Sequence, residues 1–177
     1  ENPIFPAFAQ VMETLLAQHG YTPVLCTQTP GGVTEDEYVE LLLDRGGAGI
    51  IFVSGMHADI TAEHGRYRSL VERGLPIVLV NGFAEGVDAP FISDDDAAAM
   101  DLAVTHLVAM GHRRIGLALG PRRFVPVVRK RAAFIDAMTR QTGMSAEDAA
   151  SLVSHSLFAV EGGQAAGFGL VGQVGGD

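Results

Sequence analysis

The stretch Thr105-His-Leu-Val-Ala-Met-Gly-His-Arg-Arg-Ile-Gly-Leu-Ala-Leu-Gly120 decides the fold class. Apolar residues at helical spacing lead to Met110 and stop at Gly111, where a glycine can adopt the left-handed conformation that closes a helix. After a short basic step, residues 115–119 have the length and composition of a buried strand. The stretch therefore predicts one helix-to-strand step of a parallel sheet.

The same alternation of strand and helix recurs on both sides of this stretch. Residues 1–6 are predicted to form a loop, because proline interrupts regular backbone hydrogen bonding. Thr34 and Glu37 form the capping-box pattern of a helix start. We expect strands at 22–26, 49–53, 76–80, 115–119 and 151–154, and helices at 6–20, 34–46, 94–111, 128–141 and 161–171, with a further helix ending near Arg73. Such alternation predicts an α/β fold, in which a parallel sheet carries helices on both faces.

The composition is that of a folded domain with a sizeable core. The 177 residues are 47% hydrophobic, with a mean hydropathy of +0.23, which is enough for one large domain or two small lobes. The net charge of −9 argues against this chain itself binding a phosphate backbone. A single cysteine, Cys26, suits a reducing compartment, and no apolar run approaches the roughly 18 residues of a membrane span.

Motifs of catalysis are mostly missing from the sequence. It has no phosphate-binding loop, no serine nucleophile elbow and no Cys/His cluster with zinc spacing, so we expect no catalytic residue, no cofactor and no metal. The acidic triplet at residues 94–96 is compatible with a metal, but its place before a helical pattern favours a helix start. A contact between Asp95 and a polar ligand is compatible with that role.

Five of the twelve basic residues lie between Arg122 and Arg131. A nucleic-acid patch and a solvated helix face are both open as explanations. The acidic chain and the position after the carboxyl end of a strand favour contact with an anion or a polyhydroxyl ligand. Phe5 and Phe124 are predicted in loops at the edges of a cleft, where an aromatic ring either stacks on a ligand or plugs the core.

Several short segments follow one another in a distinctive order. They are Asn2-Pro3-Ile4-Phe5, Gly20-Tyr21, Tyr38-Val39-Glu40-Leu41-Leu42, Gly49-Ile50-Ile51, Gly74-Leu75-Pro76-Ile77-Val78, Asp95, Gly111-His112-Arg113-Arg114-Ile115, Gly120-Pro121 and Arg129-Lys130. In order and spacing they resemble the effector-binding domain of the lactose-repressor family of bacterial transcription regulators, which is itself similar to periplasmic sugar-binding proteins. The resemblance extends from Glu1 to about Val171.

The resemblance implies an architecture of two Rossmann-like lobes, as in type I periplasmic binding proteins. Residues 1–93 would form the N-terminal lobe, and residues 94–177 would form the crossover and the beginning of the C-terminal lobe. Compared with the family, we expect the first strand, the DNA-binding head and the rest of the second lobe to lie outside this chain. The second lobe is therefore expected to be incomplete.

The resemblance also implies a function. A small effector, a sugar or a purine, would bind between the lobes and change how paired helix-turn-helix heads sit on operator DNA. The expected protein is a cytoplasmic homodimer without membrane association, and it is not an enzyme. The alternative is a periplasmic sugar-binding protein of a transporter, which would carry an export signal in place of the DNA-binding head.

The resemblance assigns the ligand contacts to Ile4, Phe5, Ser54, Asn81, Asp95, Phe124, Arg129 and Lys130. Lys130 falls where the family usually has an arginine, so either this lysine or the adjacent Arg129 takes that role. Phe124 and Pro126 replace polar groups, which implies a ligand that is less hydrophilic there than a typical sugar. We expect Arg129→Ala and Lys130→Ala to weaken effector binding without unfolding the protein.

Overall fold

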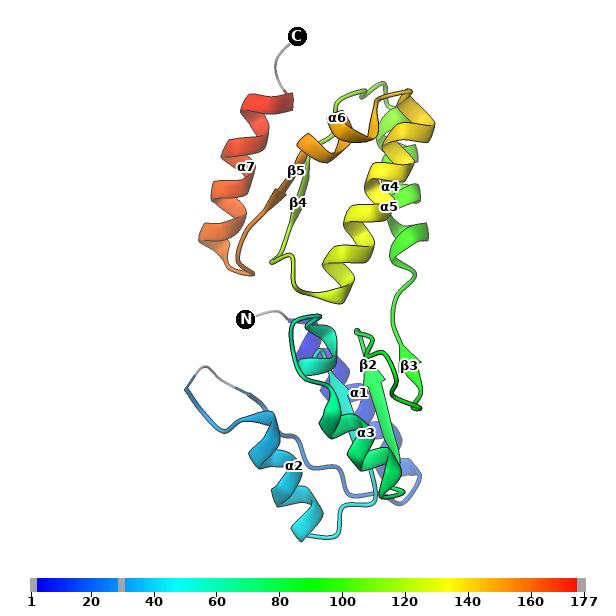
Figure 1. Cartoon of the computed structure of the whole chain (residues 1–177), viewed down its shortest axis with the longest axis vertical. Helices are drawn as coiled ribbons and strands as arrows, with labels where there is room; N and C mark the ends of the chain where they lie inside the picture. The colour runs from blue at the N-terminus through cyan, green and yellow to red at the C-terminus, as the bar shows by residue number, and fades with distance from the viewer. Residues whose placement is uncertain (1–2, 29–30, 175–177) are drawn as a thin grey trace.

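The strands form two separate parallel sheets in the computed structural model, which describes residues 3–28 and 31–174 (Figure 1). One sheet has the order β1-β2-β3, with β1 (Ile50–Val53), β2 (Ile77–Val80) and β3 (Phe91–Ile92). The other joins β4 (Leu117–Leu119) to β5 (Val153–His155). All strand pairs are parallel, which confirms the predicted α/β fold class.

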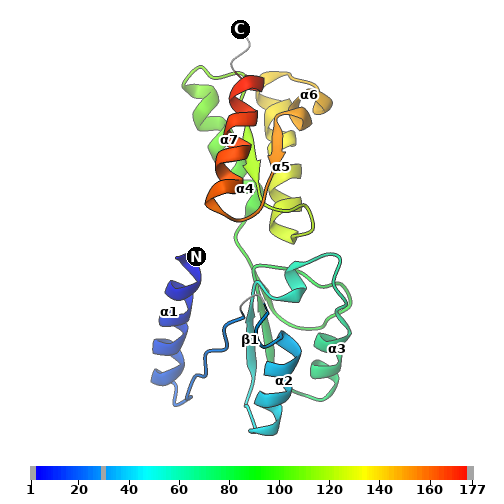
Figure 2. The same cartoon turned by 90° about the vertical axis from the view of Figure 1, so that its left-hand side faces the viewer.

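Helices lie on both sides of each sheet, although α1 buries none of its residues. They are α1 (Ile4–Gln18), α2 (Glu35–Asp44), the short 3₁₀ helix η1 (Met56–Ala58), α3 (Gly65–Glu72), α4 (Asp96–Ala109), α5 (Val125–Thr142), α6 (Ala146–Ser151) and α7 (Val160–Val174). In Figure 2, α1 lies on one side of β1, whereas α2 and α3 lie on the other. In Figure 1, α7 covers β4 and β5 from the side opposite to α4 and α5.

Each sheet has its own hydrophobic core. We call α1 to β3 the N-terminal half and α4 to α7 the C-terminal half. The first core includes Phe52, Tyr67 and Leu79, and the second includes Phe134 and Met138. The lobe boundary at residue 93, between β3 and α4, stays a prediction. Within the described part of the chain, every helix is too short or too polar to traverse a lipid bilayer.

Local sequence signals place most of these elements. The Thr34 hydroxyl accepts a hydrogen bond from the Glu37 amide at 3.2 Å, and the Glu37 carboxylate accepts one from the Thr34 amide at 2.7 Å. This confirms the predicted capping box of α2. Asp95 caps α4 through the Ala98 amide at 2.9 Å, which confirms the acidic triplet as a helix start. Gly111 follows the end of α4 with a φ of +96°, as the helix-to-strand step requires.

Two predicted segments have the wrong secondary structure, and a third has the wrong bounds. Residues 22–26 form no strand, and the side chains of Val24 and Leu25 are 67% and 64% exposed. An apolar segment becomes a strand only where a neighbour supplies the hydrogen-bond ladder, and no described strand pairs with this one.

The predicted loop over residues 1–6 is the second error: α1 begins at Ile4 and so includes Phe5, while residues 1–2 lie outside the described residues. A proline in the first turn lacks only an amide that the helix would leave unpaired. The third concerns the strand predicted over 151–154. A strand is present, but it is β5 (Val153–His155), because residues 151–152 end the unpredicted helix α6. Ser145 caps α6 by accepting from the Asp148 amide at 3.0 Å.

Candidate ligand-binding site

The carboxyl ends of the two sheets point toward each other. In Figure 1, β2 rises toward the C-terminal half, and β4 and β5 descend toward the N-terminal half. β1 runs parallel to β2. The residues that follow the five strands are Ser54, Asn81, Ser93, Gly120 and Ser156. Ligands of open α/β sheets bind outside the carboxyl ends of the strands, so the region between the halves is the candidate site.

Ser54 and Asn81 form a polar pair at the ends of β1 and β2. The Asn81 side-chain amide donates a hydrogen bond to the Ser54 hydroxyl at 2.7 Å, and both side chains are half-buried. Both residues have positive φ, 49° and 62°, a backbone conformation that costs non-glycine residues energy and that clusters at ligand sites. The structure therefore brings together two of the residues assigned by the resemblance.

The two basic candidates contact different groups beside the connection from β3 to α4. Lys130 forms an ion pair with Asp96, whose side chain is only 4% exposed. Arg129 donates a hydrogen bond to the Ser93 hydroxyl at 3.0 Å. Lys130 is thus the cation that neutralises a buried carboxylate, whereas Arg129 makes an exposed polar contact. Asp96 was missed by the sequence reasoning, which named its neighbour Asp95.

A surface pocket of about 530 Å³ lies beside the start of α4. It is lined by Asp94, Asp95, Asp96, Ala97, Arg129, Ala132, Ala133 and Asp136. Two of the predicted residues, Asp95 and Arg129, therefore share one pocket. Its carboxylates accept hydrogen bonds and its guanidinium donates them, which is the chemistry that a hydroxylated ligand needs.

Phe124 presents an aromatic surface at the start of α5. Its ring lies 5.7 Å from that of Phe158, measured between centroids, and the guanidinium carbon of Arg123 lies 5.0 Å from the Phe124 centroid. The Phe158 side chain is 73% exposed. Sequence reasoning found Phe124 but missed Phe158, although both are aromatic residues that follow a strand of the second sheet.

Ile4 and Phe5 lie on a helix and not at the end of a strand. They begin α1, at the end of that helix nearest the C-terminal half, and they are 43% and 40% exposed (Figure 1). Neither residue lines the pocket beside α4. Their role as ligand contacts stays a prediction.

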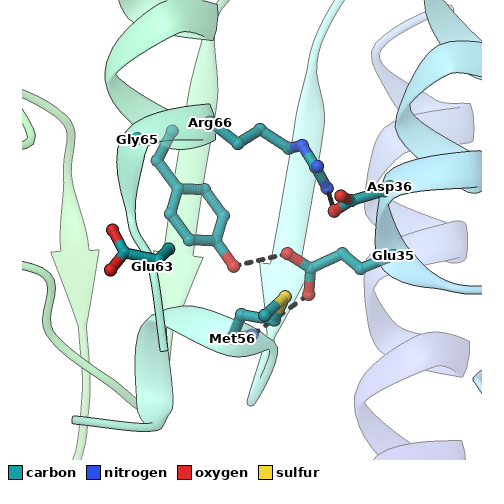
Figure 3. Close-up of a pocket in the computed structure, with 7 residues that line it drawn as sticks. Glu35, Asp36, Met56, Glu63, Gly65 and Arg66 are labelled. Carbon is teal, nitrogen blue, oxygen red and sulfur yellow. Dashed lines mark hydrogen bonds and ion pairs between the residues drawn. The ribbon is translucent and has the colours of Figure 1, made fainter. Parts of the chain in front are cut away.

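A buried polar cluster fixes η1 after β1. The Tyr67 hydroxyl donates to Glu35 Oε1 at 2.5 Å, and Glu35 Oε2 accepts from the Met56 amide at 3.1 Å (Figure 3). The Tyr67 hydroxyl also accepts from the His57 amide at 3.0 Å. Burial raises the pKa of the Tyr67 phenol far above its usual range, so the hydroxyl stays a donor. An adjoining pocket of about 210 Å³ is lined by Glu35, Asp36, Met56, Glu63, Gly65, Arg66 and Tyr67. We interpret the cluster as a support for the loop that leads to the candidate site.

His57 is fully buried in this cluster. Its burial predicts that the free energy of unfolding depends on pH. Burial lowers the pKa of His57 below its ordinary value of 6.5, while Nε2 contacts the Val80 carbonyl at 3.0 Å. Below pH 6.5 the unfolded chain therefore takes up a proton that the folded protein resists. We expect the free energy of unfolding to fall as the pH drops from 7.5 to 5.5, in urea titrations at each pH.

Two matched variants show whether the pH dependence comes from His57 or from another histidine. His57→Gln keeps a donor for the Val80 carbonyl and should flatten the fall over this pH range. His106→Gln changes an exposed histidine of α4 and should leave the fall as it is. Equal slopes in the wild type and His57→Gln would contradict the prediction.

Comparison with known proteins identifies relatives over almost the whole chain. A family model described as periplasmic binding proteins and sugar binding domain of LacI family matches residues 1–155. The HTH-type transcriptional regulator MalR of Streptomyces coelicolor is 62% identical over 174 residues, which cover 98% of this chain and 51% of that protein. The regulator reg1 of Streptomyces lividans is 61% identical, with the same coverage. The chain thus spans about half the length of these curated relatives.

Solved structures share the fold at lower identity. A LacI family transcriptional regulator from Enterococcus faecium with bound ribose superimposes with a TM-score of 0.74 at 23% identity, covering 96% of this chain and 59% of that one. A complex of the transcriptional regulator CelR with cellobiose gives 0.65 at 24% identity, covering 89% and 46%. At these identities, the similarity shows that the fold is shared.

Proposed function

Because the chain belongs to the family of periplasmic binding proteins and LacI-type sugar-binding domains, we propose that it is the effector-sensing domain of a bacterial DNA-binding transcription regulator. The resemblance drawn from the sequence is confirmed by this membership, and so is the expectation that the chain is not an enzyme. The curated relatives MalR and reg1 are both named HTH-type regulators, which favours this proposal over a periplasmic protein of a transporter.

We infer that the effector is a sugar. The observation that carries this inference is the set of groups beyond the carboxyl ends of the strands. The hydroxyl–amide pair of Ser54 and Asn81 offers hydrogen bonds, and the exposed rings of Phe124 and Phe158 offer an apolar face. Pockets that combine apolar surface with a few placed polar groups fix the orientation of a small ligand. The ribose and cellobiose bound to the two solved relatives support the same class of ligand.

The proposed mechanism is a population shift. A sugar that contacts both halves binds best when their strand ends are close, so it favours that arrangement over others. In a cytoplasmic homodimer with paired DNA-binding heads, this arrangement changes the affinity for operator DNA. Linkage requires operator DNA to change the affinity for the sugar by the same factor.

The full-length protein that carries this chain tests the proposal. Isothermal titration calorimetry with ribose, cellobiose, maltose and the purine hypoxanthine should show binding by at least one sugar and not by the purine. Fluorescence anisotropy with operator DNA should then show a change in Kd of about 5- to 150-fold on addition of that sugar. Sugar binding in a protein without affinity for DNA would instead support the transporter alternative, and binding of the purine alone would overturn the assignment of the effector.

A further inference from the structure

The two halves touch at a second place besides the chain connection between β3 and α4. Residues 59–60, which follow η1, lie against residues 123–124, which precede α5. Asp59 and Phe124 form an antiparallel bridge, and the Ile60 amide donates a hydrogen bond to the Arg123 carbonyl at 2.8 Å. Asp59 Oδ2 also lies 3.1 Å from Arg123 Nε in an ion pair. We call these four residues the latch.

Each partner of the ion pair is also held by a contact within its own half. The other Asp59 carboxylate oxygen accepts from the Thr61 amide at 2.9 Å and from the Thr61 hydroxyl at 2.6 Å. The Asp59 side chain is only 16% exposed. The Arg123 guanidinium rests over the Phe124 ring. Fewer rotamers are therefore lost when the pair forms, so it retains more of its attraction than a typical surface pair.

The latch restrains relative motion of the two halves, because each half has its own core. Relative motion is the default for units that have their own cores and share a small interface. Helices and strands of the described chain pack mainly within their own half, so the latch is a contact that relative motion would have to break. The latch also includes Phe124, whose ring contacts Phe158, and so it connects η1 to the aromatic surface of the candidate site.

We propose that the latch stabilises the arrangement in which the strand ends of the two halves are close, even when no effector is bound. It therefore sets the balance between close and separated halves on which an effector then acts. An ion pair of this kind shifts the ratio of the two arrangements by about 2- to 5-fold. Because its charges are partly exposed, salt weakens it.

The test measures the distance between the halves in the full-length protein without effector. Spin labels replace Glu40 on α2 and Glu147 on α6, which are exposed, in a background where native cysteines such as Cys26 are serine. Double electron–electron resonance then gives the distance distribution. Asp59→Asn and Arg123→Gln should each move about 2- to 5-fold more of the population to separated halves. Arg122→Gln removes a neighbouring exposed charge that has no partner among the described residues, and it should change nothing.

A backbone variant tests the remaining part of the latch. Ile60→Pro removes the amide that donates to Arg123, and the extended backbone of Asp59 (φ −101°, ψ 113°) suits a residue before proline. It should separate the halves, whereas Ile60→Ala should not. The charge exchange Asp59→Arg with Arg123→Asp should restore part of the close population. Unchanged distributions in Asp59→Asn, Arg123→Gln and Ile60→Pro, with melting temperatures equal to the wild type, would overturn the proposal.

Discussion

Lys130→Ala will destabilise the protein by about 2–3 kcal/mol, because it leaves the Asp96 carboxylate buried without its cation. The Asp96 side chain is 4% exposed, so water cannot replace the lost ammonium group. The Lys130 side chain is 32% exposed, which places the expected cost below that of a fully buried pair. Urea unfolding of the variant and the wild type at pH 7 measures this difference.

This expectation differs from the one drawn from the sequence, which placed Arg129 and Lys130 in the cleft and expected alanine at either position to weaken effector binding without unfolding the protein. Arg129→Ala removes an exposed hydrogen bond to Ser93 and should cost no more than about 1 kcal/mol. Lys130→Met with Asp96→Asn removes both charges at once and should regain most of the lost stability. If Lys130→Ala is as stable as Arg129→Ala, Lys130 does not neutralise a buried carboxylate.

The same variant also tests the role of Lys130 at the candidate site. Without urea, and at a temperature where Lys130→Ala stays folded, we expect the affinity of this variant for the effector to fall tenfold or more. A loss of this size is typical when a hydrogen bond to a charged group is removed. The double variant Lys130→Met with Asp96→Asn should recover stability but not affinity. Recovery of both would assign Lys130 to the fold alone.

Elements that begin or end within one short motif were predictable from the sequence. Thr34 and Glu37 satisfy each other's backbone amides, and Asp95 caps α4, through bonds that span three residues. Gly111 closes the same helix by its own backbone conformation. Interactions of this kind depend only on neighbours in the chain, so a pattern of residue types is enough to locate them.

Pairing between distant segments was not predictable in the same way. The apolar residues near Val24 have the pattern of a strand, but a strand also needs a partner, and the sequence does not say whether one is adjacent. Phe5 lies in a helix because two prolines at its start do no harm there. The short helix α6 depends on a single serine cap at Ser145, a signal too brief to stand out in the sequence.

Residues of the candidate site were likewise predictable only where a local sequence pattern places them. Ser54 and Asn81 were found because they follow strands, and strand ends are where ligands bind. Asp96 was missed because the triplet offers three identical side chains, and only the fold shows that the last of them is buried against Lys130. The approach of Asp59 to Arg123 joins residues 64 positions apart, for which no local pattern exists.

Gly82→Ala will destabilise the protein by about 2–3 kcal/mol, because no space exists for a methyl group behind η1. An added Cβ would lie 2.6 Å from His57 Cδ2, 2.8 Å from Ala58 Cα and 2.9 Å from the Ala58 amide nitrogen. Two of these atoms are backbone and cannot rotate away, so the clash must displace η1 or the end of β2. Either movement also strains the hydrogen bond from the Phe83 amide to the His57 carbonyl, which is 3.1 Å long.

The displacement would also reach the candidate site, because Asn81 precedes Gly82 and Asp59 follows η1 directly. Thermal unfolding should therefore show a lower melting temperature, and the distance measurement between labelled halves should show a larger separated population. Gly163→Ala is the matched control: an added Cβ in α7 meets nothing within 4 Å, so alanine should stabilise that helix by up to about 1 kcal/mol. If Gly82→Ala proves as stable as Gly163→Ala, the contact between η1 and the end of β2 does not resist an added methyl group, and the expected effect on the candidate site fails with it.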